Sequence, residues 1–161
     1  MPKLLFVCTG NTCRSSMAEG IARQLIAEKG LNLEVMSAGV FALPGTPATE
    51  EAVEALSDDG IDISGHRATL LTKELIKEAD LVLTMTAEHR RMVREMVPEY
   101  SNKIFTLAEY AGVGGDLPDP FGQPLTVYRE YAGRLRGLVG AALERWRREN
   151  ESSEQENAPE A

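Results

Sequence analysis

An α/β fold built on a parallel sheet is predicted by three features of this 161-residue sequence. Short apolar runs alternate with stretches of helical periodicity, which is the pattern of strands joined by crossover helices. The length fits a single domain with a full hydrophobic core, and no internal repeat divides it. With 43% apolar and 26% charged residues, the composition is typical of a soluble globular protein. We therefore expect helices on both faces of one parallel sheet.

The strands are predicted from short apolar runs bounded by turn residues. The run DLVLTM is the most strand-like segment of the chain. The carboxyl ends of parallel strands share one edge of the sheet, and ligands of such sheets bind beyond that edge. The four predicted strands cover residues 3–8, 33–38, 80–85 and 103–107.

Two helices are predicted in the first third of the chain. After Ser15, apolar residues recur at helical spacing until Gly30 supplies a stop. Thr46 and Pro47 resemble an N-cap followed by proline at the first helical position. That pair predicts a second helix running through Leu56.

Three further helices follow. Thr72 is expected to begin a short helix, and Thr86 to cap a helix that runs toward Pro98. A long amphipathic helix is predicted over about residues 126–148.

The acidic charge of the chain is concentrated at its C-terminal end. Residues 149–161 hold five glutamates and no basic residue, and the whole chain has a net charge of −8. We expect this segment to be a disordered, solvating tail that follows a single domain of residues 1–148. The rest of the chain has 17 basic and 20 acidic residues. This near balance argues against nucleic acid as a partner.

The sequence predicts a cytoplasmic protein. No signal peptide is recognisable at the start, and no stretch approaches the ~18 apolar residues that cross a bilayer. The only two cysteines lie in one loop, which is not the pattern of a secreted disulfide framework. We expect no membrane association.

That loop follows the first strand and reads CTGNTCRS over residues 8–15. Cys8 and Arg14 have the spacing C-x5-R between a predicted strand and a predicted helix N-terminus. A loop of this length can surround a tetrahedral oxyanion with backbone N–H groups, aided by the helix dipole. Gly10 and Asn11 tolerate the torsions of such a curl, and Arg14 can bind two phosphate oxygens at once.

The same loop is expected to activate the thiol of Cys8. An electropositive concavity lowers the pKa of a cysteine from about 8.5 toward about 3.5 to 7.5, and the Ser15 hydroxyl can donate to the thiolate. Metal binding by Cys8 and Cys13 is disfavoured, because the only two histidines are distant and no further cysteine exists. We therefore predict a cysteine nucleophile that attacks phosphorus without a metal or other cofactor.

Four segments together resemble the low-molecular-weight protein tyrosine phosphatase family: VCTGNTCRSSMAE, SAGV, DLVLTM and DPFG. The resemblance covers about residues 2–148. Within the family, the sequence most resembles the bacterial protein arginine phosphatase branch, because it has Thr12 followed by Cys13. We accordingly expect a three-layer sandwich with a four-stranded parallel sheet in the order 2-1-3-4. Ser16 departs from the family, which generally has proline there, and this should affect rigidity rather than chemistry.

The resemblance assigns the catalytic roles. Cys8 matches the nucleophile, Arg14 the phosphate clamp and Asp119 the general acid. The chemistry itself demands an acid, because the leaving group needs a proton. Asp116 is the alternative candidate, but Asp119 precedes Pro120 on a stiffened loop, whereas Asp116 is expected to cap a turn.

The resemblance also assigns supporting roles. Ser15 matches the hydrogen-bond partner of the thiolate, and Asn11, Ser37 and His66 match a network that holds the loop in shape. His89 lies in the charged segment AEHRR and is expected to be solvated. The expected phosphate-binding residues are Thr9, Gly10, Asn11, Thr12, Cys13, Arg14 and Ser15.

Substrate choice is expected to depend on Thr12 and Phe121. A small Thr12 leaves room for the flat guanidinium of phosphoarginine, and Phe121 is the single aromatic residue on its side of the cleft. A protein-tyrosine phosphatase is the main alternative. An arsenate reductase would need cysteines after Cys13, and a non-catalytic anion-binding or redox-sensing module would not need Asp119.

Expected partners are phosphorylated protein substrates and inhibitory phosphate-like anions, and a monomer is expected. Cys8 and Cys13 form a candidate redox pair, since a neighbouring thiol can trap a sulfenic acid as a disulfide. The alternative is that Cys13 is only a small packed residue.

Overall fold

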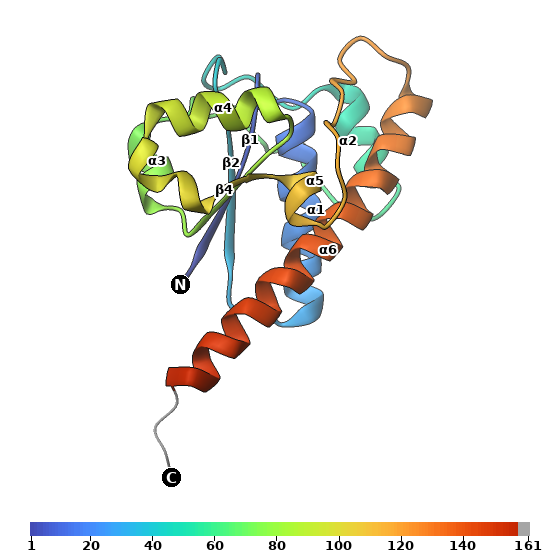
Figure 1. The fold of residues 1–161 in the computed structure, drawn as a ribbon. Coiled ribbons are helices and arrows are strands. Elements are labelled where there is room, and N and C mark those ends of the chain that lie inside the picture. Colours follow the sequence, from blue (N-terminus) through green and yellow to red (C-terminus); the bar gives the residue numbers. More distant parts are fainter. Residues whose placement is uncertain (158–161) are drawn as a thin grey trace.

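The computed structural model describes the backbone of residues 1–157 and the side chains of residues 1–151. Strands and helices alternate along the chain, and Figure 1 shows the helices arranged around one central sheet. The elements are β1 (Lys3–Cys8), α1 (Arg14–Lys29), β2 (Glu34–Gly39), α2 (Glu50–Ser57), α3 (Lys73–Glu78), β3 (Leu81–Thr84), α4 (Ala87–Met96), η1 (Pro98–Lys103), β4 (Ile104–Thr106), α5 (Leu107–Tyr110) and α6 (Leu125–Asn157).

The sheet has four parallel strands in the order β2-β1-β3-β4. This confirms the predicted fold class and strand order. Because the strands are parallel, their carboxyl ends share one edge of the sheet, where the loop between β1 and α1 lies. Figure 1 shows β1 and β2 running upward toward that edge. The 310 helix η1 and the single-turn helix α5 were not predicted.

Each face of the sheet has its own apolar cluster, because alternate side chains of a strand point to opposite faces. Leu4 and Phe6 of β1 belong to the cluster shared with α1, α2 and α6. Leu5 and Val7 belong to the cluster shared with α3 and α4. All four side chains are essentially inaccessible to solvent. Burial of such a side chain contributes about 1.5–3 kcal/mol, so β1 is fixed from both sides at the point where it enters the site loop.

The predicted starts of α3 and α4 are confirmed. Thr72 accepts a hydrogen bond from Leu75 N–H, and Thr86 accepts one from His89 N–H. In each case the hydroxyl oxygen satisfies a backbone donor that the helix leaves unpaired.

The predicted start of α2 is wrong. Thr46 and Pro47 do not open a helix, because this segment pairs with a neighbouring one: Ala68 N–H donates to Thr46 O, and Pro47 forms an antiparallel bridge with Arg67. Pairing of this kind requires extended backbone. The helix begins at Glu50, with Thr49 as its N-cap.

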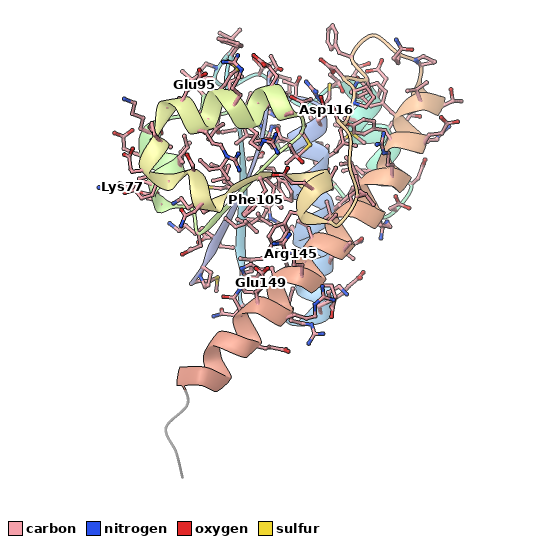
Figure 2. The ribbon with its side chains drawn as sticks, in the orientation of Figure 1. Lys77, Glu95, Phe105, Asp116, Arg145 and Glu149 are labelled. Atoms are coloured by element: carbon pink, nitrogen blue, oxygen red, sulfur yellow. The ribbon has the colours of Figure 1, made fainter. Side chains whose placement is uncertain are left out.

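Helix α6 ends at Asn157 rather than at the predicted residue 148. Side-chain pairs one turn apart favour the continuation: Arg145 pairs with Glu149 and Arg147 with Glu151. Arg145 also lies 4.1 Å from the centre of the Tyr110 ring. Figure 2 shows Arg145 and Glu149 on this distal half of α6, with Arg145 beside Phe105 of β4. Residues 158–161 of the expected tail lie outside the described residues.

None of the helices in the described part of the chain is both long enough and apolar enough to cross a membrane.

Candidate active site

The loop between β1 and α1 encloses a cavity of about 240 Å³ at the carboxyl edge of the sheet. The cavity is bounded on one side by this loop and on the other by the segment that precedes α6. Its lining residues are Cys8, Thr9, Gly10, Asn11, Thr12, Cys13, Arg14, Asp119 and Phe121. Residues more than 100 positions apart in the sequence therefore meet at one site.

Cys8 lies at the bottom of this cavity with 2% of its surface exposed. Its Sγ is 2.8 Å from Ser15 Oγ and accepts the Asn11 backbone N–H at 3.2 Å. The two hydrogens of Asn11 Nδ2 go to Ser15 Oγ and Ser37 Oγ, at 2.8 Å and 2.9 Å. The only proton of Ser15 is therefore left to donate to Cys8. Ser15 itself is buried beneath the thiol and does not line the cavity.

Opposing influences act on the pKa of Cys8. Burial raises the pKa of this thiol above its ordinary value, whereas the hydrogen bonds from Ser15, the charge of Arg14 and the Asn11 amide lower it. Burial is the largest of these influences. The net direction is upward, so the lowered pKa of Cys8 expected from the sequence is wrong: burial outweighs the hydrogen bonds and the charge of Arg14.

Asn11 is the central residue of the network that fixes the loop. It is completely buried and has a φ of 58°, a left-handed conformation that asparagine tolerates better than most residues. Its side-chain oxygen accepts Thr69 N–H at 2.9 Å, and its backbone oxygen accepts the His66 Nε2–H at 2.6 Å. The Ser37 hydroxyl donates a hydrogen bond to Glu19 Oε1 at 3.0 Å. The structure thus brings Asn11, Ser37 and His66 together.

The end of β2 approaches the loop so closely that only glycine fits there. A side chain on Gly39 would overlap the backbone oxygen of Thr9 and the backbone nitrogen of Asn11. The neighbouring residue confirms the contact, because Val40 N–H donates to Cys8 O at 2.9 Å.

Arg14 is almost wholly buried, with 6% of its surface exposed, and its guanidinium is held at several points. Nη1 donates to Leu117 O at 3.1 Å, and Nη2 donates to Thr9 Oγ1 at 3.3 Å. Nη2 also lies 3.7 Å from Asp119 Oδ2. This positive charge sits in the first turn of α1, beside the cavity.

The two candidate acids occupy different positions. Asp119 lines the cavity with its side chain half exposed, and its Oδ1 accepts Phe121 N–H at 3.0 Å. Asp116 Oδ1 instead accepts the backbone N–H of Ala87, the first residue of α4, at 2.9 Å. Figure 2 shows Asp116 at that end of α4. Asp119 is therefore the carboxylate placed beside Cys8 and Arg14.

Cys13 and Thr12 complete the loop. The Cys13 Sγ lies 3.4 Å from Tyr128 OH and 3.6 Å from Thr49 Oγ1, and both cysteines are free thiols. Thr12 is half-buried, and its carbonyl accepts the N–H of Thr49, the N-cap of α2. A Cys8–Cys13 disulfide stays a prediction.

The expectation that His89 is solvated is wrong. Only 5% of its surface is exposed, and its Nε2 lies 2.8 Å from Thr9 Oγ1. His89 and Val93 are one helical turn apart on the buried face of α4. That four-residue spacing was the available signal, but the charged residues on either side of His89 obscured it.

Other contributors to the site had no signal in the sequence. The backbone oxygen of Leu117, the backbone nitrogen of Thr69 and the carboxylate of Glu19 act through the fold rather than through a motif.

The arrangement defines a class of protein. A buried thiol lies at an electropositive helix N-terminus, an arginine beside it can bind phosphoryl oxygens, and a carboxylate across the cavity can transfer a proton. These are the parts of a phosphatase that works through a cysteine nucleophile.

The chain belongs to the low molecular weight phosphotyrosine protein phosphatase family, whose model matches residues 3–152. It is 45% identical over 137 residues to a protein-arginine-phosphatase of Bacillus subtilis, which covers 84% of this chain and 91% of that protein. The crystal structure of a low molecular weight protein tyrosine phosphatase from T. tengcongensis has a TM-score of 0.87 and 51% identity, over 89% of this chain and 99% of that one.

A further solved structure is of the YwlE arginine phosphatase, as a cysteine-to-serine mutant with a phosphorylated active-site serine. It has a TM-score of 0.87 and 42% identity, over 90% of this chain and 95% of that one. The chain is thus a phosphatase, while the names of its relatives include both arginine and tyrosine enzymes.

Proposed function

We propose that this phosphatase hydrolyses phosphoarginine in proteins, with Cys8 as nucleophile, Arg14 as phosphate clamp and Asp119 as acid and base. The observation that carries the proposal is the lining of the cavity, where Thr12 stands in the loop and Asp119 and Phe121 face it. The relation to the Bacillus subtilis protein-arginine-phosphatase supports the same substrate.

The reaction proceeds in two steps. The Cys8 thiolate attacks phosphorus, the P–N bond to the arginine side chain breaks, and the departing nitrogen takes the proton of Asp119. Water then attacks the phosphocysteine while Asp119 accepts a proton, which releases phosphate and restores the thiolate. Arg14 and the loop amides stabilise the equatorial oxygens in both steps. The phosphoserine in the YwlE mutant supports an intermediate on this residue.

The shape and charge of the lining support the proposed specificity for arginine. A guanidinium group is flat and carries several N–H donors, so a carboxylate can both orient and protonate it. Asp119 is half exposed and faces the cavity, which suits that role. Thr12 is smaller than isoleucine, and its side chain leaves room for the plane of the guanidinium. Phe121 is 69% exposed and offers one apolar surface to the aliphatic part of the substrate.

Tyrosine is the alternative substrate, and one observation favours it: the T. tengcongensis relative, at 51% identity, is called a protein tyrosine phosphatase. The same cysteine chemistry applies, with a phenol as leaving group. The two substrates differ in what must fit beside Thr12.

The deciding experiment compares kcat/KM on phosphoarginine and phosphotyrosine peptides for the wild type and Thr12→Ile. The replacement adds about one methylene and removes the hydroxyl, a change worth ~1–3 kcal/mol between competing substrates. We expect phosphoarginine hydrolysis to fall ~10-fold or more, while phosphotyrosine hydrolysis is maintained or rises. Thr12→Val is the matched control, because it removes the hydroxyl without adding length.

If Thr12→Ile lowers both activities in parallel, position 12 only sets loop packing and the argument for arginine fails. A wild type that prefers the phosphotyrosine peptide would assign the enzyme to the tyrosine branch.

A further inference from the structure

His89 is a buried titratable group that the reaction described above does not use. It lies in the first turn of α4, and its Nε2 is 2.8 Å from Thr9 Oγ1 in the phosphate-binding loop. Its other ring nitrogen, Nδ1, is buried and has no hydrogen-bond partner among the described residues. Buried polar atoms of this kind are rare in folded proteins and require an explanation.

Thr9 connects this histidine to the phosphate clamp. Arg14 Nη2 donates to Thr9 Oγ1 at 3.3 Å, and a guanidinium can only donate. The hydroxyl oxygen of Thr9 thus lies between Arg14 and His89, and Thr9 itself lines the cavity.

The proton on His89 can be placed by comparing its two neutral forms. With the proton on Nδ1, the structure would bury an N–H that has no acceptor, which is the more costly kind of unpaired group. With the proton on Nε2, the ring donates to Thr9 Oγ1, and only a lone pair on Nδ1 stays unpaired. Thr9 then accepts hydrogen bonds from both Arg14 and His89, and its own hydroxyl proton is left to point into the cavity.

The charges around His89 favour the neutral ring. Arg14 faces it from the loop, Asp116 and Asp119 face it from the segment before α6, and Glu88 precedes it on α4. Burial and the charge of Arg14 outweigh the three carboxylates and lower the pKa of His89 to about 4. A protonated ring would also place an unpaired donor at Nδ1.

We propose that His89 is a positioning residue of the phosphatase reaction: it holds the Thr9 hydroxyl so that its oxygen anchors Arg14 and its proton is presented to a phosphoryl oxygen. The phosphoryl group then receives one side-chain donor from Thr9 in addition to Arg14 and the loop amides. The role is the same for any phosphorylated side chain, so it does not depend on the choice between arginine and tyrosine.

The first turn of α4 is held in a way that suits this role. The Thr86 hydroxyl accepts the His89 N–H at 3.1 Å, and Asp116 accepts the Ala87 N–H at 2.9 Å. Because Asp116 belongs to the same segment as Asp119, one loop supplies the acid and also fixes the helix that carries His89.

The test uses an aryl phosphate substrate and inorganic phosphate as inhibitor, on the full chain. Gln replaces His89 with an amide whose N–H can reach the position of Nε2, whereas Phe keeps the volume and removes the donor. We expect His89→Phe to lower kcat/KM and to raise the inhibition constant of phosphate, each on the order of 10-fold, as for loss of a hydrogen bond to a charged group. We expect His89→Gln to stay within about threefold of the wild type, since the bond to Thr9 is kept.

Thr9→Val supplies the second arm, because it removes the hydroxyl through which His89 acts. If the proposal is right, adding His89→Phe to Thr9→Val causes no further loss, so the two effects are strongly non-additive. Val93→Ala is the matched control, because Val93 is buried on the same helix and does not line the cavity. It should lower thermal stability without changing kcat/KM.

Three results would overturn the proposal. They are full activity in His89→Phe, losses that add with those of Thr9→Val, and equal impairment of His89→Gln and His89→Phe. Should His89→Phe fail to fold, His89→Asn replaces it, since its shorter side chain cannot reach Thr9. Activity of the Asn variant equal to that of the Gln variant would then count against the proposal.

Discussion

The N-terminus of α1 differs from the N-termini of the four helices α2, α3, α4 and α5. Each of those four begins with a threonine whose hydroxyl accepts a backbone N–H, and each has glutamate in its first turn. The N-cap residue of α1 is Cys13, whose side chain accepts no capping hydrogen bond, and the first turn of α1 has no acidic residue. Its first residue is Arg14, a cation placed at the positive end of the helix dipole.

The difference shows which helix end is kept for a ligand. A threonine cap and a glutamate satisfy the unpaired N–H groups and the dipole from within the protein. At α1 both are missing, so an anion must supply what the other four ends already have. The charge of Arg14 is unfavourable at the positive end of the α1 dipole, and a bound anion would offset it. The start of α1 is thus an exception to the pattern that α2, α3, α4 and α5 share.

The largest expected effect comes from Cys8→Ser, which leaves this open helix end intact and removes only the thiolate. We expect kcat to fall below about 1% of the wild type, given the scale of losses at nucleophiles. Phosphate and vanadate should still bind, because Arg14 and the amides are unchanged. Steady-state kinetics measure the loss of kcat, and calorimetry measures the binding of phosphate and vanadate. Retention of more than ~1% activity would contradict the role of Cys8.

The acid across the cavity should have the next largest effect. Asp119→Asn removes the proton donor, and we expect kcat to fall ~100-fold or more on substrates with poor leaving groups. The loss should be smaller for aryl phosphates whose phenols leave readily.

Asp116→Asn is the matched control for that substitution. Its amide oxygen can still accept Ala87 N–H, so kcat should stay within about threefold. A larger loss from Asp116→Asn than from Asp119→Asn would reverse the assignment of the acid.

Ser15→Ala isolates the groups that lower the pKa of Cys8. Without the Ser15 hydrogen bond that pKa should rise, so less thiolate is present at any pH below it. The rate of alkylation by iodoacetamide, followed against pH, should reach its midpoint at a higher pH than in the wild type. Ser16→Ala is the control, because Ser16 donates to Cys13 O rather than to the thiol. An unchanged midpoint in Ser15→Ala would contradict the claim that the Ser15 hydrogen bond lowers the pKa of Cys8.

The smallest effect is expected at one of the capped helix ends. Thr72→Ala should destabilise the protein by about 1 kcal/mol, which lowers Tm by roughly 2–4 °C in a chain of this size. Its kcat/KM should not change, since α3 does not line the cavity. Phosphate should raise the Tm of this variant and of the wild type equally, because it binds at the N-terminus of α1 and does not contact α3. Thermal denaturation with and without phosphate measures both.

The sequence was informative where local chemistry decides the structure. The glycine, asparagine and arginine of the loop indicated an oxyanion site, and Thr72 and Thr86 marked helix starts, because a cap acts on residues only two or three positions away. The alternation of apolar runs with helical periodicity predicted the parallel sheet for the same reason.

It was misleading where distant contacts decide. Thr46 and Pro47 have the form of a helix start, yet residues 67 and 68 hold them extended. His89 stands among charged neighbours, and its burial depends on Thr9, which is 80 positions away. Leu117 contributes only a carbonyl oxygen to Arg14, which every residue type could do.

Gly39 sets a limit on transplanting this site to another protein. The loop of residues 8–15 holds its curve against the bare backbone of β2 at Gly39, and against Thr69 and His66 from a third segment. Inserting CTGNTCRS between the strand and helix of an unrelated α/β scaffold would transfer the residues of the loop without the neighbouring segments that hold its conformation. A working graft needs the adjacent strand to end in glycine at the matching register, opposite Cys8. The smallest transferable unit is therefore two neighbouring parallel strands with their following loops, together with the segment that carries His66 and Thr69. The eight residues of the loop alone do not specify the site.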